Sequence, residues 1–233
     1  MKKLLLLTTL LLTAVLINAQ SLEEIVKKYS VANKLDKVSS FQTIKITGKV
    51  TMMGMELPME IWMKNPSKVK TVTNINGQEM IQAYDGTKGY MVNPMSGSTD
   101  PVEMPADAVN SLEKNNVFTN YMAEYLKEGK LKLLGEESVN GKPAFKIQAA
   151  IGEANATMFL DKESYLLVKT TAEVNQNGQA ITIESFPSNY TDNNGIYLPM
   201  KTTASFSGMD MVTEFSKVEV NIPMDDSIFT LKK

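Results

Sequence analysis

The stretch GKVTMMGMELPMEIWMKNP, residues 48–66, places five methionines within twelve positions and has a Gly-Met pair near its middle. With Gly54 and Met55 as the two loop residues, glycine in the first position predicts a type II′ hairpin turn. That register sets Val50 opposite Met59. Because side chains alternate along a strand, one face of the hairpin is wholly apolar and the other is mixed. The stretch therefore predicts an antiparallel hairpin that buries one face.

The methionines on the apolar face allow three interpretations. Lys49 and Glu60 are predicted to face outward as a cross-strand pair. The predicted inward set is Ile46, Val50, Met52, Leu57, Met59, Ile61 and Met63. Methionine fills irregular gaps in an ordinary core, lines an adaptable pocket for acyl chains, or selects copper(I) through its soft thioether. Copper(I) is disfavoured, because strand alternation separates Met52 from Met53 and the chain has no histidine. Composition alone does not separate a core from a pocket.

From Thr43 onward, alternating apolar residues are interrupted by turn pairs at regular intervals. The predicted turns are Asn76-Gly77, Asp85-Gly86, Asn140-Gly141, Asn177-Gly178, Asn194-Gly195 and Gly208-Met209. The last of them would set Phe206 opposite Met211, as an echo of the first hairpin. This spacing predicts a long antiparallel meander and a mainly β fold with a few helices.

Two segments have helical periodicity instead. Ser21 and Glu24 form a capping-box pattern ahead of an apolar stripe that continues to Leu35. Residues 105–128 carry apolar side chains at helical intervals, with Asn115-Asn116 as a predicted break between two helices. The part from 107 to 128 is rich in asparagine, which weakens helices, yet offers large apolar side chains. We predict that it forms a mobile cover over an apolar opening. The alternative is a helix that stays packed on the sheet.

The composition excludes many kinds of catalytic site. The chain has no histidine, no cysteine and no arginine, so catalytic triads and nitrogen- or thiolate-bound zinc are ruled out. The acidic pairs Glu136-Glu137 and Asp225-Asp226 are sequence neighbours, whose side chains point to opposite faces of a strand. A net charge of −2 gives no basic surface for nucleic acid. We expect no enzyme activity, no cofactor and no metal.

The first residues have the pattern of a secretory signal peptide. Lys2 and Lys3 precede an apolar run, and Ala19 offers a small residue at the cleavage point. Residues 1–19 are therefore predicted to be a signal peptide and residues 20–233 a single domain. Without the two leader lysines the net charge becomes −4, from −2 minus 2. We expect an exported, periplasmic protein that is soluble after signal removal.

The order of these elements resembles the LolA/LolB-like superfamily of outer-membrane lipoprotein-sorting proteins. The passages that carry the resemblance are KVSSFQTIKITGKV, MEIWMKNPSKVKTV, AYDGTKGYMVNP, MFLDKESYLLVKTTAEVNQNGQAITIESFPSNYTDNNGIYLPMKT and VEVNIPMDDSIFTLKK. They cover nearly the whole chain after the leader. The resemblance implies an incompletely closed antiparallel β-barrel, with helices across its opening and an apolar cavity for acyl chains. Lipoprotein carriers of the superfamily use an arginine to hold the helical lid closed, and that residue has no counterpart here.

On this resemblance we expect a carrier for an amphiphile, either a lipid or the acyl chains of a lipoprotein, with a role in lipoprotein sorting. The expected ligand-binding residues are the inward set of the first hairpin together with Leu112, Phe118, Tyr121, Met122 and Tyr125. The segment GQEMIQAYDGTKGYMVNP also resembles accessory domains of insulinase-like zinc peptidases. The alternative is therefore a non-catalytic interaction module whose partner is another envelope protein.

Overall fold

The computed structural model describes residues 20–97, 99–114, 116–151, 154–176, 179–206 and 208–231. The predicted signal peptide and the Asn177-Gly178 turn lie outside these residues. The strands are β1 (Thr43–Met52), β2 (Met55–Lys64), β3 (Lys68–Ile75), β4 (Gln78–Tyr84), β5 (Gly89–Val92), β6 (Val102–Glu103), β7 (Leu131–Val139), β8 (Lys142–Ile151), β9 (Ala154–Asp161), β10 (Leu167–Gln176), β11 (Gln179–Asn193), β12 (Ile196–Phe206) and β13 (Met209–Val220).

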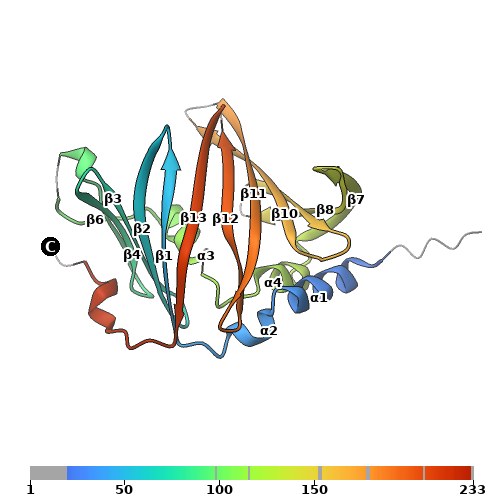
Figure 1. Ribbon diagram of the computed structural model, residues 1–233, viewed down its shortest axis with the longest axis horizontal. Coiled ribbons are helices and arrows are strands. Elements are labelled where there is room, and N and C mark those ends of the chain that lie inside the picture. Colours follow the sequence, from blue (N-terminus) through green and yellow to red (C-terminus); the bar gives the residue numbers. More distant parts are fainter. Residues whose placement is uncertain are drawn as a thin grey trace, which may run out of the picture.

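Within the described residues, these strands form one 13-stranded sheet in the order β6-β5-β4-β3-β2-β1-β13-β12-β11-β10-β9-β8-β7. Each pair of neighbours is antiparallel. The edge strands β6 and β7 are not hydrogen-bonded to each other in this part of the chain, so the curved sheet of Figure 1 is an incomplete barrel. The predicted fold class is confirmed.

The helices lie along one side and one end of the sheet (Figure 1). They are α1 (Leu22–Ala32), α2 (Leu35–Val38), α3 (Ala106–Lys114) and α4 (Tyr121–Lys127), with short 3-10 turns η1 (Pro94–Ser96) and η2 (Asp226–Phe229). The backbone N–H of Glu24 donates to Ser21 Oγ over 3.2 Å, which confirms the predicted cap of α1. Lys34 adopts φ 54°, so the helical stripe breaks there and Leu35 begins a second helix.

The predicted register of the first hairpin is wrong by two residues. Met52 pairs with Met55, so Met53 and Gly54 are the loop residues. Both have positive φ, 51° and 77°, which defines a type I′ turn. Glycine therefore occupies the second loop position and not the first. Val50 consequently pairs with Leu57 and not with Met59.

The predicted assignment of side chains to the two faces of this hairpin is still correct, because a shift of two residues leaves every side chain on its predicted side. The predicted Lys49–Glu60 pair does not form. Lys49 makes an ion pair with Glu56 instead, and Lys45 reaches Glu60 over 2.8 Å.

The same error applies to the second Gly-Met pair. Phe206 pairs with Met209, and not with Met211 as predicted. Gly208 has φ 77° and, like Gly54, occupies the second of the two loop positions. In contrast, the predicted Asn-Gly turns at Asn76, Asn140 and Asn194 are all confirmed, each with positive φ at both residues.

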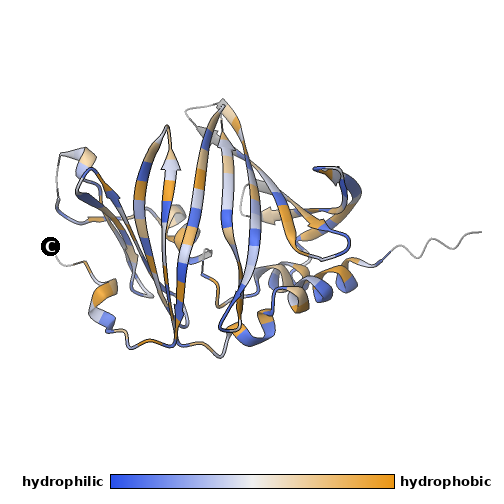
Figure 2. Ribbon diagram, viewed as in Figure 1, coloured by the Kyte–Doolittle hydropathy of each residue, from blue (hydrophilic) through white to orange (hydrophobic). Residues whose placement is uncertain are grey.

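The interior is divided between two main apolar clusters, and apolar and polar segments alternate along the strands above them (Figure 2). The first cluster lies under β1–β4 and α3, and contains Val38, Phe41, Ile44, Ile46, Met63, Val69, Tyr84, Met104, Leu112, Phe118, Ile196 and Val218. The second joins α1 and α4 to β7–β9, and contains Ile25, Val26, Met122, Leu131, Phe145, Ile147, Ala149 and Leu160. The domain thus has two cores under one sheet.

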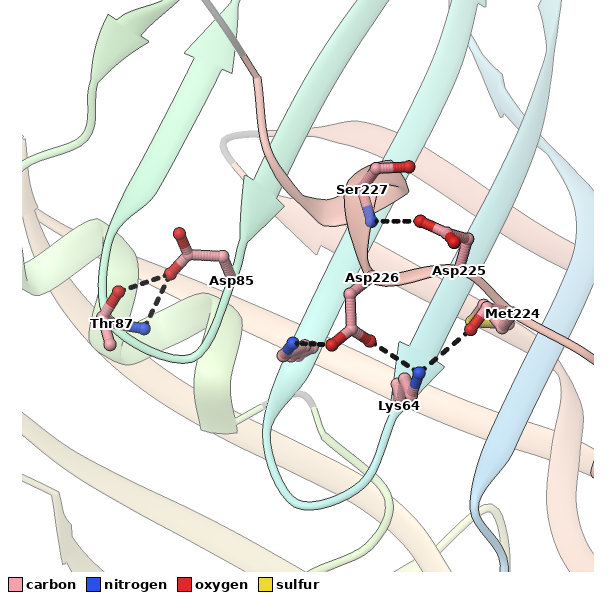
Figure 3. Close-up of polar contacts among 8 residues, drawn as sticks. Lys64, Asp85, Thr87, Met224, Asp225, Asp226 and Ser227 are labelled. Atoms are coloured by element: carbon pink, nitrogen blue, oxygen red, sulfur yellow. Dashed lines mark hydrogen bonds and ion pairs between the residues drawn. The ribbon is translucent and has the colours of Figure 1, made fainter.

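The C-terminal segment is fastened to the β2–β3 corner by ion pairs (Figure 3). Asp226 of η2 accepts from Lys64 over 2.6 Å and from Lys68 over 2.8 Å. Lys64 also donates to the carbonyl oxygen of Met224, over 2.9 Å. Asp225 accepts the backbone N–H of Ser227 over 2.8 Å and begins the 3-10 turn. Both carboxylates thus hold the C-terminal segment in place.

Candidate functional site

A cavity of about 280 Å³ lies between the helices and the middle strands of the sheet. It lies where the two cores meet: Val38 and Ile196 belong to the first core, and Met122 to the second. Its lining is Tyr29, Asn33, Leu35, Val38, Val117, Thr119, Asn120, Tyr121, Met122, Tyr125, Met158, Leu167, Pro187, Tyr190, Ile196, Tyr197, Leu198 and Pro199. The described residues that line it include no charged side chain.

Four larger hollows, of about 310, 420, 440 and 490 Å³, differ from this cavity in their chemistry. Each has charged side chains in its wall: Glu113 and Glu124, Lys88 and Glu103, Glu24 and Lys28, and Lys142 and Asp161, in that order. Charged walls suit solvent and not an apolar ligand. The smaller cavity between the cores is therefore the candidate ligand site.

Tyrosines dominate the wall of the cavity. It contains five of the chain's eight tyrosines, from α1, α4, β11 and β12. The rings of Tyr190 and Tyr197 stack with centroids 5.7 Å apart, and those of Tyr121 and Tyr125 lie 6.2 Å apart. Such rings give large, stiff apolar surfaces with a polar tip.

Most polar groups of the lining are already bonded within the protein. The hydroxyl of Tyr190 donates to the Leu167 carbonyl oxygen over 2.9 Å, and that of Tyr121 donates to the Glu113 carbonyl oxygen over 3.0 Å. Asn33 donates to the Tyr29 carbonyl oxygen over 2.9 Å. Burial raises the pKa of Tyr29, and it raises that of Tyr190 far above the ordinary value. The phenols of these two residues therefore stay neutral at physiological pH.

Asparagine in the helical segment has structural roles that the sequence does not reveal. Asn120 caps α4 by accepting the N–H of Ala123 over 3.2 Å, and its amide donates to Ser30 over 2.8 Å. Asn116 accepts the N–H of Phe118 over 2.8 Å. The predicted break between two helices is thus confirmed on its described side, while Asn115 lies outside the described residues. Opening of the segment as a lid stays a prediction.

The predicted ligand residues fall into three groups. Tyr121, Met122 and Tyr125 line the cavity. Four others, Ile46, Met63, Leu112 and Phe118, are buried in the first core, and Ile61 packs against it. The remaining four, Val50, Met52, Leu57 and Met59, lie nearer the β1–β2 turn and belong to neither core nor to the cavity wall. Their role in ligand binding stays a prediction.

Sequence reasoning missed the part of the cavity wall that β9–β12 supply. Tyr190 and Tyr197 flank the Asn194-Gly195 turn within the passage NYTDNNGIYLP. A pair of tyrosines on either side of a tight turn, with a proline beside the second, was the available signal. Met158 and Leu167 gave none, because their apolar character fits any buried strand.

Solved structures share this architecture over most of the chain. A DUF1329 family protein from Desulfovibrio piger aligns with a TM-score of 0.61 at 13% identity, over 89% of this chain and 99% of its own. A LolA superfamily protein from Nitrosomonas europaea aligns with a TM-score of 0.56 at 12% identity, over 84% and 96%. The protein has a LolA-like fold.

A third LolA-like neighbour is described as an outer membrane lipoprotein-sorting protein domain, from Vibrio parahaemolyticus. It aligns with a TM-score of 0.59 at 11% identity, over 90% of this chain and 97% of its own. No family model matches the sequence, and no curated protein matches it. Among the described residues of this LolA-like chain, no helix has the length and apolar character needed to cross a membrane.

Proposed function

We propose that this LolA-like protein is a non-catalytic carrier that binds an amphiphile, either a lipid or the acyl chains of a lipoprotein. The observation that carries the proposal is the cavity between the two cores, whose described lining is apolar and aromatic without a charged side chain. Its volume of about 280 Å³ lies at the lower end of the range of roughly 300–1,000 Å³ for ligand pockets. It therefore takes part of one chain or one compact apolar group.

The place of action that we propose is the periplasm. The signal-peptide pattern of residues 1–19 supports export. Structural similarity to a LolA superfamily protein and to a lipoprotein-sorting domain supports a role in handling lipids or lipoproteins within the envelope.

The direct test is to purify the exported protein, extract any bound amphiphile with organic solvent and identify it by mass spectrometry. A carrier is expected to release an amphiphile in a constant ratio to protein. An empty extract, together with no binding of an uncharged fluorescent probe such as N-phenyl-1-naphthylamine, would overturn the proposal.

A matched pair of variants locates the site. Leu198 lines the cavity, whereas Leu134 is 44% exposed on the edge strand β7. Leu198→Trp should narrow the cavity and weaken probe binding by about tenfold or more, because the ligand loses part of the volume that it occupied. Leu134→Trp should leave binding unchanged. Equal binding by both variants would place the ligand elsewhere.

An interaction module is the second candidate function, and one surface feature favours it. Met53 and Met55 at the β1–β2 turn and Met209 at the β12–β13 turn are exposed. Exposed methionines are typical of adaptable contact surfaces. If the extract is empty and Met53→Ser abolishes capture of an envelope protein, this second function replaces the first.

A further inference from the structure

The charged side chains around the cavity restrict which ligands it can bind. Lys34 lies beside the Tyr197 ring, 5.9 Å from its centroid, but it is paired with Asp192. Lys130 lies beside Tyr125 and is paired with Glu128 over 2.6 Å. Both lysines near the tyrosines are therefore already neutralised.

The other charged groups that face the tyrosines are acidic. Glu113 and Glu124 both act on the hydroxyl of Tyr121 and raise its pKa, in addition to the larger effect of burial. A carboxylate or phosphate that entered here would find no free cation among the described lining and would meet negative charge at one side. An unpaired buried anion is strongly disfavoured.

The cavity still offers hydrogen bonds to a neutral group. The hydroxyl of Tyr29 makes no hydrogen bond among the described residues, and it is not fully buried, because every fully buried side-chain polar atom there has a partner. Tyr29 is close enough to Tyr190 to raise the pKa of that residue further. The Tyr190 oxygen donates its proton to Leu167 and keeps lone pairs that can accept. Tyr29 of α1 and Tyr190 of β11, both in the cavity wall, thus leave one free donor and two oxygen acceptors.

We propose that the cavity selects uncharged amphiphiles, whose ester, amide or hydroxyl group is bound by Tyr29 and Tyr190, and rejects amphiphiles that carry a charge at that position. The inference rests on the proposed carrier function and narrows its ligand class. Acyl chains linked through esters or amides fit this class, and ionised free fatty acids do not.

The test compares ligands of equal chain length as competitors of N-phenyl-1-naphthylamine. Monolaurin and dodecanol are uncharged, and lauric acid is ionised at about pH 8, far above the pKa of a carboxyl group. The neutral ligands should bind more than about tenfold more tightly, because the cavity has no partner for an anion. As the pH falls toward the pKa of the carboxyl group, the affinity of lauric acid should rise and that of monolaurin should stay the same. Equal affinity at pH 8 would overturn the inference.

Hydroxyl deletion tests the two tyrosines. Tyr29→Phe and Tyr190→Phe keep the ring, and each should weaken monolaurin binding about fivefold, the usual effect of one lost hydrogen bond. Binding of the hydrocarbon-like probe should be unchanged, which shows that the variants are folded. Tyr90→Phe is the matched control, since Tyr90 of β5 does not line the cavity. Unchanged monolaurin affinity in both cavity variants would refute the assignment, whereas failure of every ligand to bind would refute the carrier function itself.

Discussion

Asp226 is the residue whose charge matters most to the C-terminal segment. Hydrogen bonds from Lys64 and Lys68 lower its pKa to about 2. A carboxyl group in an unfolded chain titrates near about 4. Because the folded-state pKa is the lower one, the ionised form stabilises the fold above about pH 4, and this contribution is lost as the pH falls from about 4 to about 2.

Asp226→Asn should therefore lower the melting temperature at neutral pH by a small amount, since the pairs are exposed and screened. The difference from the unsubstituted protein should vanish as the pH falls toward about 2. Thermal unfolding followed by circular dichroism across this range measures it, with the exposed Asp210→Asn as the control. A difference that stays constant with pH would mean that charge is not its cause.

The methionines differ sharply in their exposure to solvent, and this difference predicts the order in which they are oxidised. Met53 is 74% exposed and Met95 77%, whereas Met63 is 4% and Met122 5% exposed. Oxidation to the sulfoxide requires contact with the oxidant. Dilute peroxide should convert Met53 and Met95 first, as measured by peptide mass spectrometry, and the order should disappear in denaturant. Early oxidation of Met63 in the folded protein would contradict the buried face of β2.

At the scale of the element, the β1–β2 turn differs from the other type I′ turns of the chain in the residue at its first loop position. The turns at Asn76, Asn140 and Asn194 place asparagine in the left-handed first position, but here Met53 holds it with φ 51°. A left-handed conformation costs an ordinary side chain roughly 1–2 kcal/mol, and asparagine tolerates it better.

Met53→Asn should accordingly stabilise the protein by about 1 kcal/mol, or roughly 2–4 °C in melting temperature for a chain of this size. Met95→Asn is the control, because Met95 is equally exposed and its φ is not positive. A lower melting temperature for Met53→Asn would show that the methionine makes a stabilising contact in the turn.

A bulge between Thr47 and Gly48 shapes the pairing of β1 with β13. A Cβ on Gly48 would lie 2.3 Å from the Glu214 carbonyl oxygen and 3.0 Å from Phe215 Cα, so backbone would have to move. Gly48→Ala should destabilise by about 2–3 kcal/mol in denaturant unfolding. Gly54→Ala, where space is open but φ is 77°, should cost only about 1 kcal/mol. Equal costs would mean that the bulge relaxes freely.

The sequence predicted the elements better than their register. Asparagine followed by glycine identifies a type I′ turn by itself, so those hairpins were predictable. A Gly-Met pair does not say which loop position glycine takes, and both such turns were misplaced by one residue, which shifts the strand pairing by two. The apolar face of the first hairpin was nevertheless right, because a period of two is unaffected by a shift of two.

At the scale of the whole molecule, the cavity was beyond what the sequence could predict. Its wall combines Tyr29 of the first helix with Pro199 of the penultimate strand, and the space between the two cores depends on how all intervening elements pack. The methionine-rich hairpin is the more conspicuous stretch, but only its base contributes to a core. Local patterns predict helices, strands and turns, whereas an unfilled volume is a property of the assembled fold.

Because the cavity borders both cores, a ligand within it should stabilise the whole domain. At about one hundred times its dissociation constant, a ligand contributes about 2.7 kcal/mol. This corresponds to a rise of roughly 5–10 °C in melting temperature for a chain of this size. Differential scanning fluorimetry with monolaurin measures it, and Leu198→Trp should show no rise. A rise of equal size in that variant would place the stabilising site outside the cavity.

The position of β13 has a consequence for how the chain is made. Ile44 near the start of β1 pairs with Val220 at the end of β13, and this pairing lies at the middle of the sheet order. During synthesis β1 can pair with β2 at once, but its other edge stays open until β13 has been made, more than 150 residues later. An open edge strand invites pairing with other chains. Removal of β13 would therefore leave one edge of β1 unpaired and open to association with other chains.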